Sequence, residues 1–267
     1  MTEISLGIGR TAAIAAAFGA AAETYEGDAG LQRRVAGKLA GRVAALPLPP
    51  SPRVLEIGCG TGFFSRALAV PLPRARWLAT DLSEAMVARC RHNGQGGESA
   101  AFLVMDGERP CLAPQPGEGF DLICASLALQ WFARPAAALA AWADILAPGG
   151  YIAWTTLADG TFREWRAAHQ ALGLSAGVAD YPDAAGLEAL WPSGGRGTVE
   201  VEELSVRYPD PRSFLDMLKH IGARVPAAGH RPLSAGALRR VLRGFAPGDF
   251  GVTWQIAYGL FRKDGAP

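Results

Sequence analysis

The stretch Val54-Leu55-Glu56-Ile57-Gly58-Cys59-Gly60-Thr61-Gly62 decides the fold of this 267-residue chain. Its first four residues are mostly apolar, which is typical of a short buried strand. The glycines that follow at alternate positions let a backbone approach a ligand closely and adopt conformations barred to other residues. A dinucleotide-binding loop would place its third glycine at position 63, where this chain has Phe63. The stretch therefore predicts a strand, a ligand-binding turn of another type, and a helix.

Strand-like and helical segments alternate on both sides of this turn. Strands separated by helices form parallel β-α-β units. Residues 162–172 then favour a helix and residues 173–197 an irregular segment. We expect a doubly wound, mostly parallel, seven-stranded α/β sheet with an inserted helical cap. The predicted strands are 53–57, 76–80, 101–105, 120–125, 151–156, 199–208 and 252–262, and the other predicted helices are 31–43, 63–70, 83–91, 135–146, 213–221 and 235–245.

The chain shows no internal repeat and no low-complexity linker, so residues 1–267 are predicted to form one domain. The Ala-rich residues 11–22 indicate a mobile arm or a weak helix. The helix at 135–146 is expected to end at Ala147-Pro148-Gly149-Gly150. The predicted parts are an N-terminal arm and helix (1–48), a core (51–160, 198–208 and 250–263) and a cap (161–197 and 209–248).

Composition excludes several classes of function. A net charge of +1 provides no overall attraction to nucleic acid or to an anionic membrane. No segment reaches the ~20 strongly apolar residues that a membrane span needs. The four cysteines lack metal-ligand spacing, which favours reduced thiols in a cytoplasmic protein without a metal. Neither nucleic acid nor membrane is an expected partner.

An acidic residue lies at, or directly after, the end of each of three successive predicted strands. Glu56 precedes the glycines, Asp81 follows the second strand, and Asp106-Gly107 follows the third. Ligands of doubly wound sheets bind at the carboxyl ends of the strands. A carboxylate at position 81 can accept hydrogen bonds from both hydroxyls of a ribose. Three such positions together indicate a nucleoside-binding site.

The glycine stretch and its acidic partners resemble motif I and the following motifs of class I S-adenosylmethionine-dependent methyltransferases. The resemblance implies S-adenosylmethionine as cofactor and S-adenosylhomocysteine as product. It also implies that Asp106 reads the adenine amino group and that Ser126 and Leu127 adjoin the methionine part. The predicted cofactor-binding residues are Tyr25, Glu56, Gly58, Cys59, Gly60, Gly62, Asp81, Leu82, Met86, Asp106, Gly107, Ser126 and Leu127.

Four further stretches resemble the biotin-pathway malonyl-acyl-carrier-protein O-methyltransferases. They are FGAAAETYEGDAGLQRRV (18–35), SLALQWF (126–132), TTLADGTFREWRAAH (155–169) and FLDMLKHIGA (214–223). One departure is Glu26, since the family pattern has Asp after the tyrosine. The resemblance implies methylation of the free carboxylate of a malonyl thioester on acyl carrier protein.

Methylation of a carboxylate requires no general base, because a carboxylate is already ionised at neutral pH. Alignment of the reacting atoms can supply ~7–11 kcal/mol. We expect Tyr25, Gln130 and Trp131 near the transferred methyl group, with Trp131 facing the sulfonium. A cation for the substrate carboxylate is expected among Arg163, Arg166 and Lys219.

Basic residues gather in residues 205–245, which contain eight Lys or Arg and two acidic residues. Arg239 and Arg243 share one face of a predicted amphipathic helix. A basic cap suits an acidic carrier protein, which would approach under electrostatic steering. A solvated Arg-rich surface remains the alternative.

Other functions stay open. A methyltransferase for a small carboxylate or a quinone precursor would not need a basic outer face. A catalytically silent cofactor-binding protein would keep the same glycine loop. A nicotinamide oxidoreductase is disfavoured by Phe63, and nucleic-acid methylation by the lack of a motif for a flipped base.

Overall fold

The computed structural model describes residues 3–94, 100–112, 119–227, 229–245 and 250–265. The ends of the predicted domain (residues 1 and 267) and of the predicted cap (residue 248) lie outside these ranges. The described helices are α1 (Glu3–Ala21), α2 (Tyr25–Asp28), α3 (Gly30–Ala44), α4 (Phe63–Ala69), α5 (Glu84–His92), α6 (Pro135–Asp144), α7 (Arg163–Gln170), α8 (Ala184–Glu188), α9 (Pro211–His220) and α10 (Ala235–Arg243), with a short 3-10 turn η2 (Leu129–Trp131).

A seven-stranded sheet forms the centre of the protein, in the order β3-β2-β1-β4-β5-β7-β6. Five strands pair in parallel, and β7 runs antiparallel between β5 and β6. This topology confirms the predicted fold class. The strands are β1 (Arg53–Ile57), β2 (Arg76–Asp81), β3 (Ala100–Val104), β4 (Phe120–Ser126), β5 (Leu146–Leu157), β6 (Gly195–Tyr208) and β7 (Phe250–Lys263).

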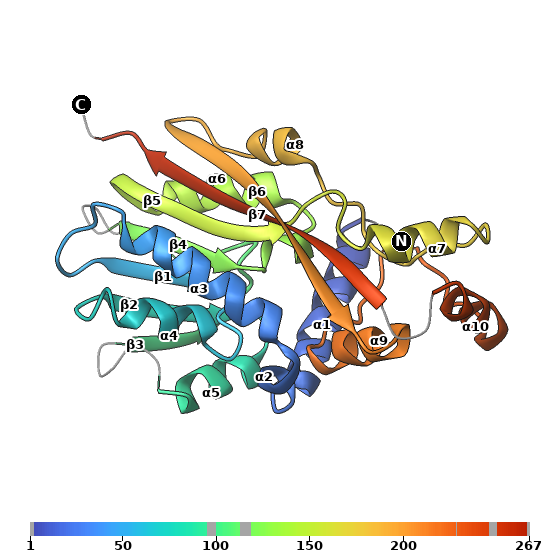
Figure 1. The fold of residues 1–267 in the computed structure, drawn as a ribbon. Coiled ribbons are helices and arrows are strands. Elements are labelled where there is room, and N and C mark those ends of the chain that lie inside the picture. Colours follow the sequence, from blue (N-terminus) through green and yellow to red (C-terminus); the bar gives the residue numbers. More distant parts are fainter. Residues whose placement is uncertain (1–2, 95–99, 113–118, 228, 246–249, 266–267) are drawn as a thin grey trace.

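Helices cover both faces of the sheet because side chains of a strand alternate between faces. In β1, Val54 is buried in a cluster with side chains of α3 and α4. Its neighbour Leu55 is buried in a second cluster with side chains of α6. Figure 1 shows α3 and α4 on one face of the sheet and α6 on the other.

Several further helices lie at one end of the sheet. Figure 1 shows α1, α7, α9 and α10 beyond the carboxyl ends of the parallel strands. Helix α1 occupies the segment in which a mobile arm or weak helix was expected, and it buries Ile14, Ala17 and Ala21. None of the helices in the described ranges is long and apolar enough to cross a bilayer.

Two predicted segments differ from the structure. Helix α6 ends at Asp144, and residues 147–150 belong to β5 rather than to a loop after the helix. Leu146 already pairs with Phe120, and the register then shifts, with Gly149 at a φ of 75°. Residues 173–197 were expected to be irregular, but they contain α8, whose first turn is capped by the Asp183 carboxylate on the Gly186 amide at 2.8 Å.

Candidate functional site

The glycine loop between β1 and α4 has the backbone that its sequence predicts. Gly58, Gly60 and Gly62 all have positive φ, at 72°, 52° and 93°. A Cβ atom on Gly58 would lie 2.8 Å from the Cβ of Ala128, so a larger residue has no room there. Gly62 immediately precedes α4, and the loop therefore turns sharply from β1 into the helix.

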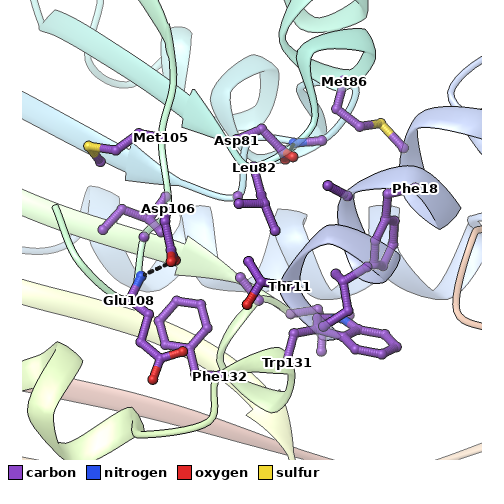
Figure 2. A pocket seen from close by; sticks show the side chains of 18 of the residues that line it. Thr11, Phe18, Asp81, Leu82, Met86, Met105, Asp106, Glu108, Trp131 and Phe132 are labelled. Carbon is purple, nitrogen blue, oxygen red and sulfur yellow. Dashed lines mark hydrogen bonds between the residues drawn. The ribbon is translucent and has the colours of Figure 1, made fainter. Parts of the chain in front are cut away.

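A cavity opens where this loop meets the ends of β2 and β4; we call it the glycine-loop cavity. Figure 2 shows its side chains converging from several elements of the fold. Its walls are Thr11, Ile14, Ala15, Phe18, Tyr25, Ile57, Gly58, Gly60, Asp81, Leu82, Met86, Met105, Asp106, Gly107, Glu108, Ser126, Leu127, Ala128, Trp131 and Phe132. Most predicted cofactor residues are therefore together.

Asp81 is the acidic residue in the middle of this cavity. Its carboxylate accepts hydrogen bonds from the backbone amides of Gly60 and Ser83, both at 2.9 Å. Burial raises the pKa of Asp81 above its usual value, and these backbone hydrogen bonds oppose the rise. Each carboxylate oxygen can accept a further hydrogen bond, so Asp81 can still bind a pair of hydroxyl groups.

A narrow slot forms the end of the cavity beside Asp106. The Asp106 carboxylate accepts a hydrogen bond from the Glu108 amide at 3.0 Å (Figure 2). A Cβ atom on Gly107 would fall 2.1 Å from Cγ2 of Ile57, so only glycine fits. Phe132 closes the opposite side. The apolar side chains of Ile57 and Phe132, with the Asp106 carboxylate nearby, suit a flat ring that carries an amino group.

Helix α1 covers the open side of the cavity. Thr11 and Phe18 project from it toward the glycine loop (Figure 2). The Phe18 ring meets the Trp131 ring edge to face, with centroids 5.3 Å apart. The N-terminal segment therefore lines the cavity with residues of α1 as well as with Tyr25.

A second cavity adjoins the first, and four residues line both: Phe18, Tyr25, Leu127 and Trp131. Leu127 has a φ of 53°, uncommon for a residue with a side chain, and its amide donates to the Thr155 carbonyl at 3.0 Å. A group held in one cavity is therefore separated from a group in the other only by these side chains.

Positive charge distinguishes the second cavity, which we call the basic cavity. Arg10, Lys219, Arg224 and His230 line it, and its described lining contains no Asp or Glu. Lys219 was predicted as a substrate cation, whereas Arg10 and Arg224 were not. They come from α1 and from the segment after α9, and no local pattern in the sequence links these distant positions. The cavity suits an anionic group.

A third, smaller cavity lies behind the glycine loop and shares Tyr25, Gly58, Gly60 and Ser126 with the glycine-loop cavity. Two predicted cofactor residues, Glu56 and Cys59, line this rear cavity and not the main one. Glu56 is buried and accepts a hydrogen bond from the Ser65 hydroxyl. Burial raises the pKa of Glu56 to about 8. Gly62 lines none of the three cavities.

Gln130 lines the basic cavity, but its amide is already engaged. Its Nε2 donates to the Leu127 carbonyl at 2.7 Å, and its Oε1 accepts from the Thr156 hydroxyl at 3.3 Å. These bonds hold Leu127 in place on the wall between the cavities. Gln130 therefore supports the backbone of Leu127. Trp131 and Tyr25 line both cavities, as a residue near the reacting atoms must.

Four of the five basic residues predicted to bind the substrate or its carrier lie outside the lining of the basic cavity. Arg163 forms a two-bond ion pair with Glu203 of β6, at 2.8 and 3.0 Å. Arg166 binds Asp180 and the Ala179 carbonyl, and so fixes the segment that carries Tyr181 into the cavity wall. Arg239 is on the exposed face of α10 with Arg243, away from the lining of all three cavities.

The sheet order, the glycine loop and the acidic residues at the strand ends define a methyltransferase of the class I fold. The family described as "Methyltransferase domain" matches residues 55–154, and a SAM-dependent methyltransferase from Thermotoga maritima superposes with a TM-score of 0.53, at 19% identity over 94% of this chain and 100% of that one. A malonyl-[acyl-carrier protein] O-methyltransferase from Magnetococcus marinus is 42% identical over 90% of this chain and 88% of its own length. The chain belongs to the malonyl-[acyl-carrier protein] O-methyltransferase family.

The chain also matches a longer relative. It is 46% identical, over 94% of its length, to the biotin biosynthesis bifunctional protein BioCD from Bordetella avium. It spans about half of that protein, 52% of its length. Both similarities extend well beyond the glycine loop.

Proposed function

We propose that this protein transfers a methyl group from S-adenosylmethionine to the free carboxylate of a malonyl thioester carried on acyl carrier protein, an early step of biotin synthesis. The observation that carries the proposal is the pair of adjoining cavities. One has carboxylates placed for a nucleoside, the other is lined by cations, and they share Phe18, Tyr25, Leu127 and Trp131.

The residues present fit S-adenosylmethionine. Asp81 offers acceptors for the ribose, and the slot at Gly107 admits a flat base beside Asp106. Oε1 of Gln32, which lines the rear cavity, is buried and accepts no hydrogen bond from any described residue. A buried acceptor without a donor is costly, and an ammonium group would supply the donor. When bound, the cofactor supplies a methyl group already activated on a sulfonium.

The protein's own residues need only orient the reactants and exclude water. Burial raises the pKa of the Tyr25 phenol well above its usual value, with the Asp81 charge adding to the rise, so Tyr25 stays protonated. It can donate a hydrogen bond but does not act as a base. Phe18 and Trp131 shield the junction from solvent, and the Trp131 ring can stabilise a neighbouring positive charge.

Cations in the basic cavity would hold the anionic end of the acceptor. Arg10 donates to the Pro226 carbonyl at 2.8 Å, which ties α1 to the segment that carries Arg224. Lys219 and Arg224 are exposed at the cavity wall. A modest set of donors is appropriate, because a very tight clamp would reduce the nucleophilicity of the carboxylate.

The carrier would dock on α10. Val241 lies on the buried face of this helix. On its exposed face are Arg239, Arg240 and Arg243, which have no ion-pair partner among the residues that the structure describes. A cationic helix face suits an acidic protein, because complementary charge speeds association.

Mass spectrometry of malonyl-acyl carrier protein, incubated with the enzyme and S-adenosylmethionine, tests the proposal. We expect one added methyl group on the malonyl thioester and none on acetyl-acyl carrier protein, which lacks the free carboxylate. Methylation of free malonate or another small acid, with malonyl-acyl carrier protein unchanged, would identify a small-molecule methyltransferase instead. No methylation of any acceptor, with binding of S-adenosylhomocysteine intact, would indicate a silent cofactor-binding protein.

A further inference from the structure

Helix α2 carries Tyr25 to the junction of the three cavities, yet little within the helix holds it there. It has four residues, none of them buried, and no side chain caps its first turn. So short a helix is not stable by itself. Its position must come from contacts that its neighbours make with other parts of the protein.

Glu26, the residue after Tyr25, makes the contacts on the side of the glycine loop. Its Oε1 accepts hydrogen bonds from Nη2 of Arg66 at 2.8 Å and from Nδ2 of Asn93 at 3.0 Å. The same two side chains also donate to the carbonyl of Thr61 in the glycine loop, at 2.9 and 3.0 Å. Glu26 and the loop are therefore joined through one shared pair of donors.

The surroundings strengthen this ion pair relative to an exposed one. The side chains of Glu26 and Arg66 are each 33% exposed, and the Phe63 ring lies 5.1 Å from the Arg66 guanidinium. Burial acts to raise the pKa of Glu26, but hydrogen bonds from Arg66 and Thr61 and the charges of Arg66 and Arg33 outweigh it and lower the pKa. Glu26 is therefore ionised at neutral pH.

On its other side α2 is attached to the cap. The Thr24 hydroxyl donates to the His220 carbonyl at 3.1 Å, and the His220 ring lies 2.8 Å from the Asp28 carboxylate. Tyr25 is thus held between two anchors, one on the glycine loop and one on α9. The anchor on the loop ends at Thr61, which lines the rear cavity next to Gly60.

We propose that Glu26, held by Arg66 and Asn93, is a positioning residue that keeps Tyr25 over the junction of the cavities and couples its position to the glycine loop. This proposal depends on the proposed function in one respect, which is that the cofactor is S-adenosylmethionine. It also gives a role to the glutamate that replaces the expected aspartate. The arrangement predicts that cofactor binding and closure of α2 reinforce one another.

Hydrogen exchange on the ligand-free protein tests the anchor without any substrate. Glu26→Gln should speed amide exchange in residues 24–29 by about five- to tenfold, because a hydrogen bond to a charged group is lost. The matched control is Glu200→Gln on β6, which breaks an exposed ion pair of the same 2.8 Å length with Arg42 of α3. Equal exchange in wild type and Glu26→Gln would overturn the proposal. If Glu26→Gln does not fold, Asn93→Ala, which removes one donor, makes the same prediction.

A double-mutant cycle then tests whether Glu26 acts through Tyr25. Glu26→Gln should weaken S-adenosylhomocysteine binding and lower kcat, each by about five- to tenfold, with the KM for the acceptor changed less. Glu26→Asp should restore part of both. In a Tyr25→Ala background the effect of Glu26→Gln should disappear, and its full persistence there would overturn the proposal. Absence of S-adenosylhomocysteine binding in the wild type would instead refute the proposed function.

Discussion

The carboxylate of Asp81, at the end of β2, accepts a hydrogen bond from the backbone amide of Gly60 at 2.9 Å. The bond joins two neighbouring strand ends across the floor of the glycine-loop cavity. It fixes the loop in the shape that faces the ligand before any ligand arrives. Asp81 therefore holds the loop, and under the proposed function it also binds the ribose.

Asp81→Asn is expected to weaken S-adenosylhomocysteine binding by about 100-fold while leaving the thermal midpoint within a few degrees of wild type. The amide keeps one acceptor oxygen for the backbone but loses the charged acceptor for the hydroxyls, and each such hydrogen bond contributes ~1.5–3 kcal/mol. Isothermal titration calorimetry provides the measurement. Asp121→Asn is the matched control, because Asp121 also accepts from a backbone amide, that of Arg53 at 2.8 Å, and lines none of the cavities. Equal losses in both variants would refute the ribose assignment.

Loss of positive charge in the basic cavity is expected to affect the acceptor and not the cofactor. Lys219→Gln and Arg224→Gln should each raise the KM for malonyl-acyl carrier protein by about fivefold or more, because a charge-assisted contact to the substrate is lost. The affinity for S-adenosylhomocysteine should stay within twofold. Steady-state kinetics combined with calorimetry separates the two effects. Weaker cofactor binding in these variants would show that the cations contact the cofactor rather than the acceptor.

Reversal of charge on α10 tests the docking surface for the carrier. The double variant Arg239→Glu and Arg243→Glu should raise the KM for malonyl-acyl carrier protein by about tenfold at low salt, and less at high salt, because complementary charge mainly sets the association rate. Malonyl-coenzyme A should be unaffected. The control is the double variant Arg74→Glu and Arg76→Glu, which has the same net charge as the α10 variant. These exposed residues lie at the start of β2, at the far end of the sheet. Equal effects on both acceptors would show that α10 does not contact the carrier.

The buried Glu56 should make stability depend on pH. Its pKa in the folded protein is raised to about 8 by burial, so between roughly pH 5 and 8 the native state binds a proton that the unfolded chain has released. Stability from this group therefore falls as pH rises through that window, by up to ~1.4 kcal/mol per pH unit. Urea denaturation of wild type and Glu56→Gln across this range should show the steeper decline in wild type. Asp81 contributes to both proteins, so the difference between their slopes isolates Glu56. Parallel curves would mean that Glu56 is ionised when buried.

Local sequence predicts much of the core because local chemistry determines it. The apolar run before the glycines forms β1 with the predicted limits of residues 53–57. The Ser83 hydroxyl caps α5 as predicted, accepting from the Met86 amide at 3.4 Å. Asp81 and Asp106 reach one cavity because the carboxyl ends of parallel strands lie at the same edge of a sheet, whereas Glu56 lines the rear cavity.

Features that depend on distant partners could not be predicted in this way. Pro148 and Gly149 are typical of a turn, yet they lie within β5, between the pair of Leu146 with Phe120 and the pair of Tyr151 with Leu122. Arg163 was expected to bind the substrate, but Glu203 on β6 holds it, forty residues along the chain. Arg10 and Arg224 reach one cavity only because α1 folds back over the cap. No spacing pattern encodes such contacts.

Tyr208 and Phe250 are paired across β6 and β7, so the chain leaves the sheet and returns to it at the same rung of the ladder. The ends of the segment between Tyr208 and Phe250 already lie side by side. The segment can therefore change in length and composition with little change in loop-closure entropy and without disturbing the strand register. Lys219 and Arg224 of the basic cavity lie in this segment, so under the proposed function part of acceptor recognition can change without altering the glycine loop. Grafting the corresponding segment from a relative with another acceptor offers a direct route to new specificities on this scaffold.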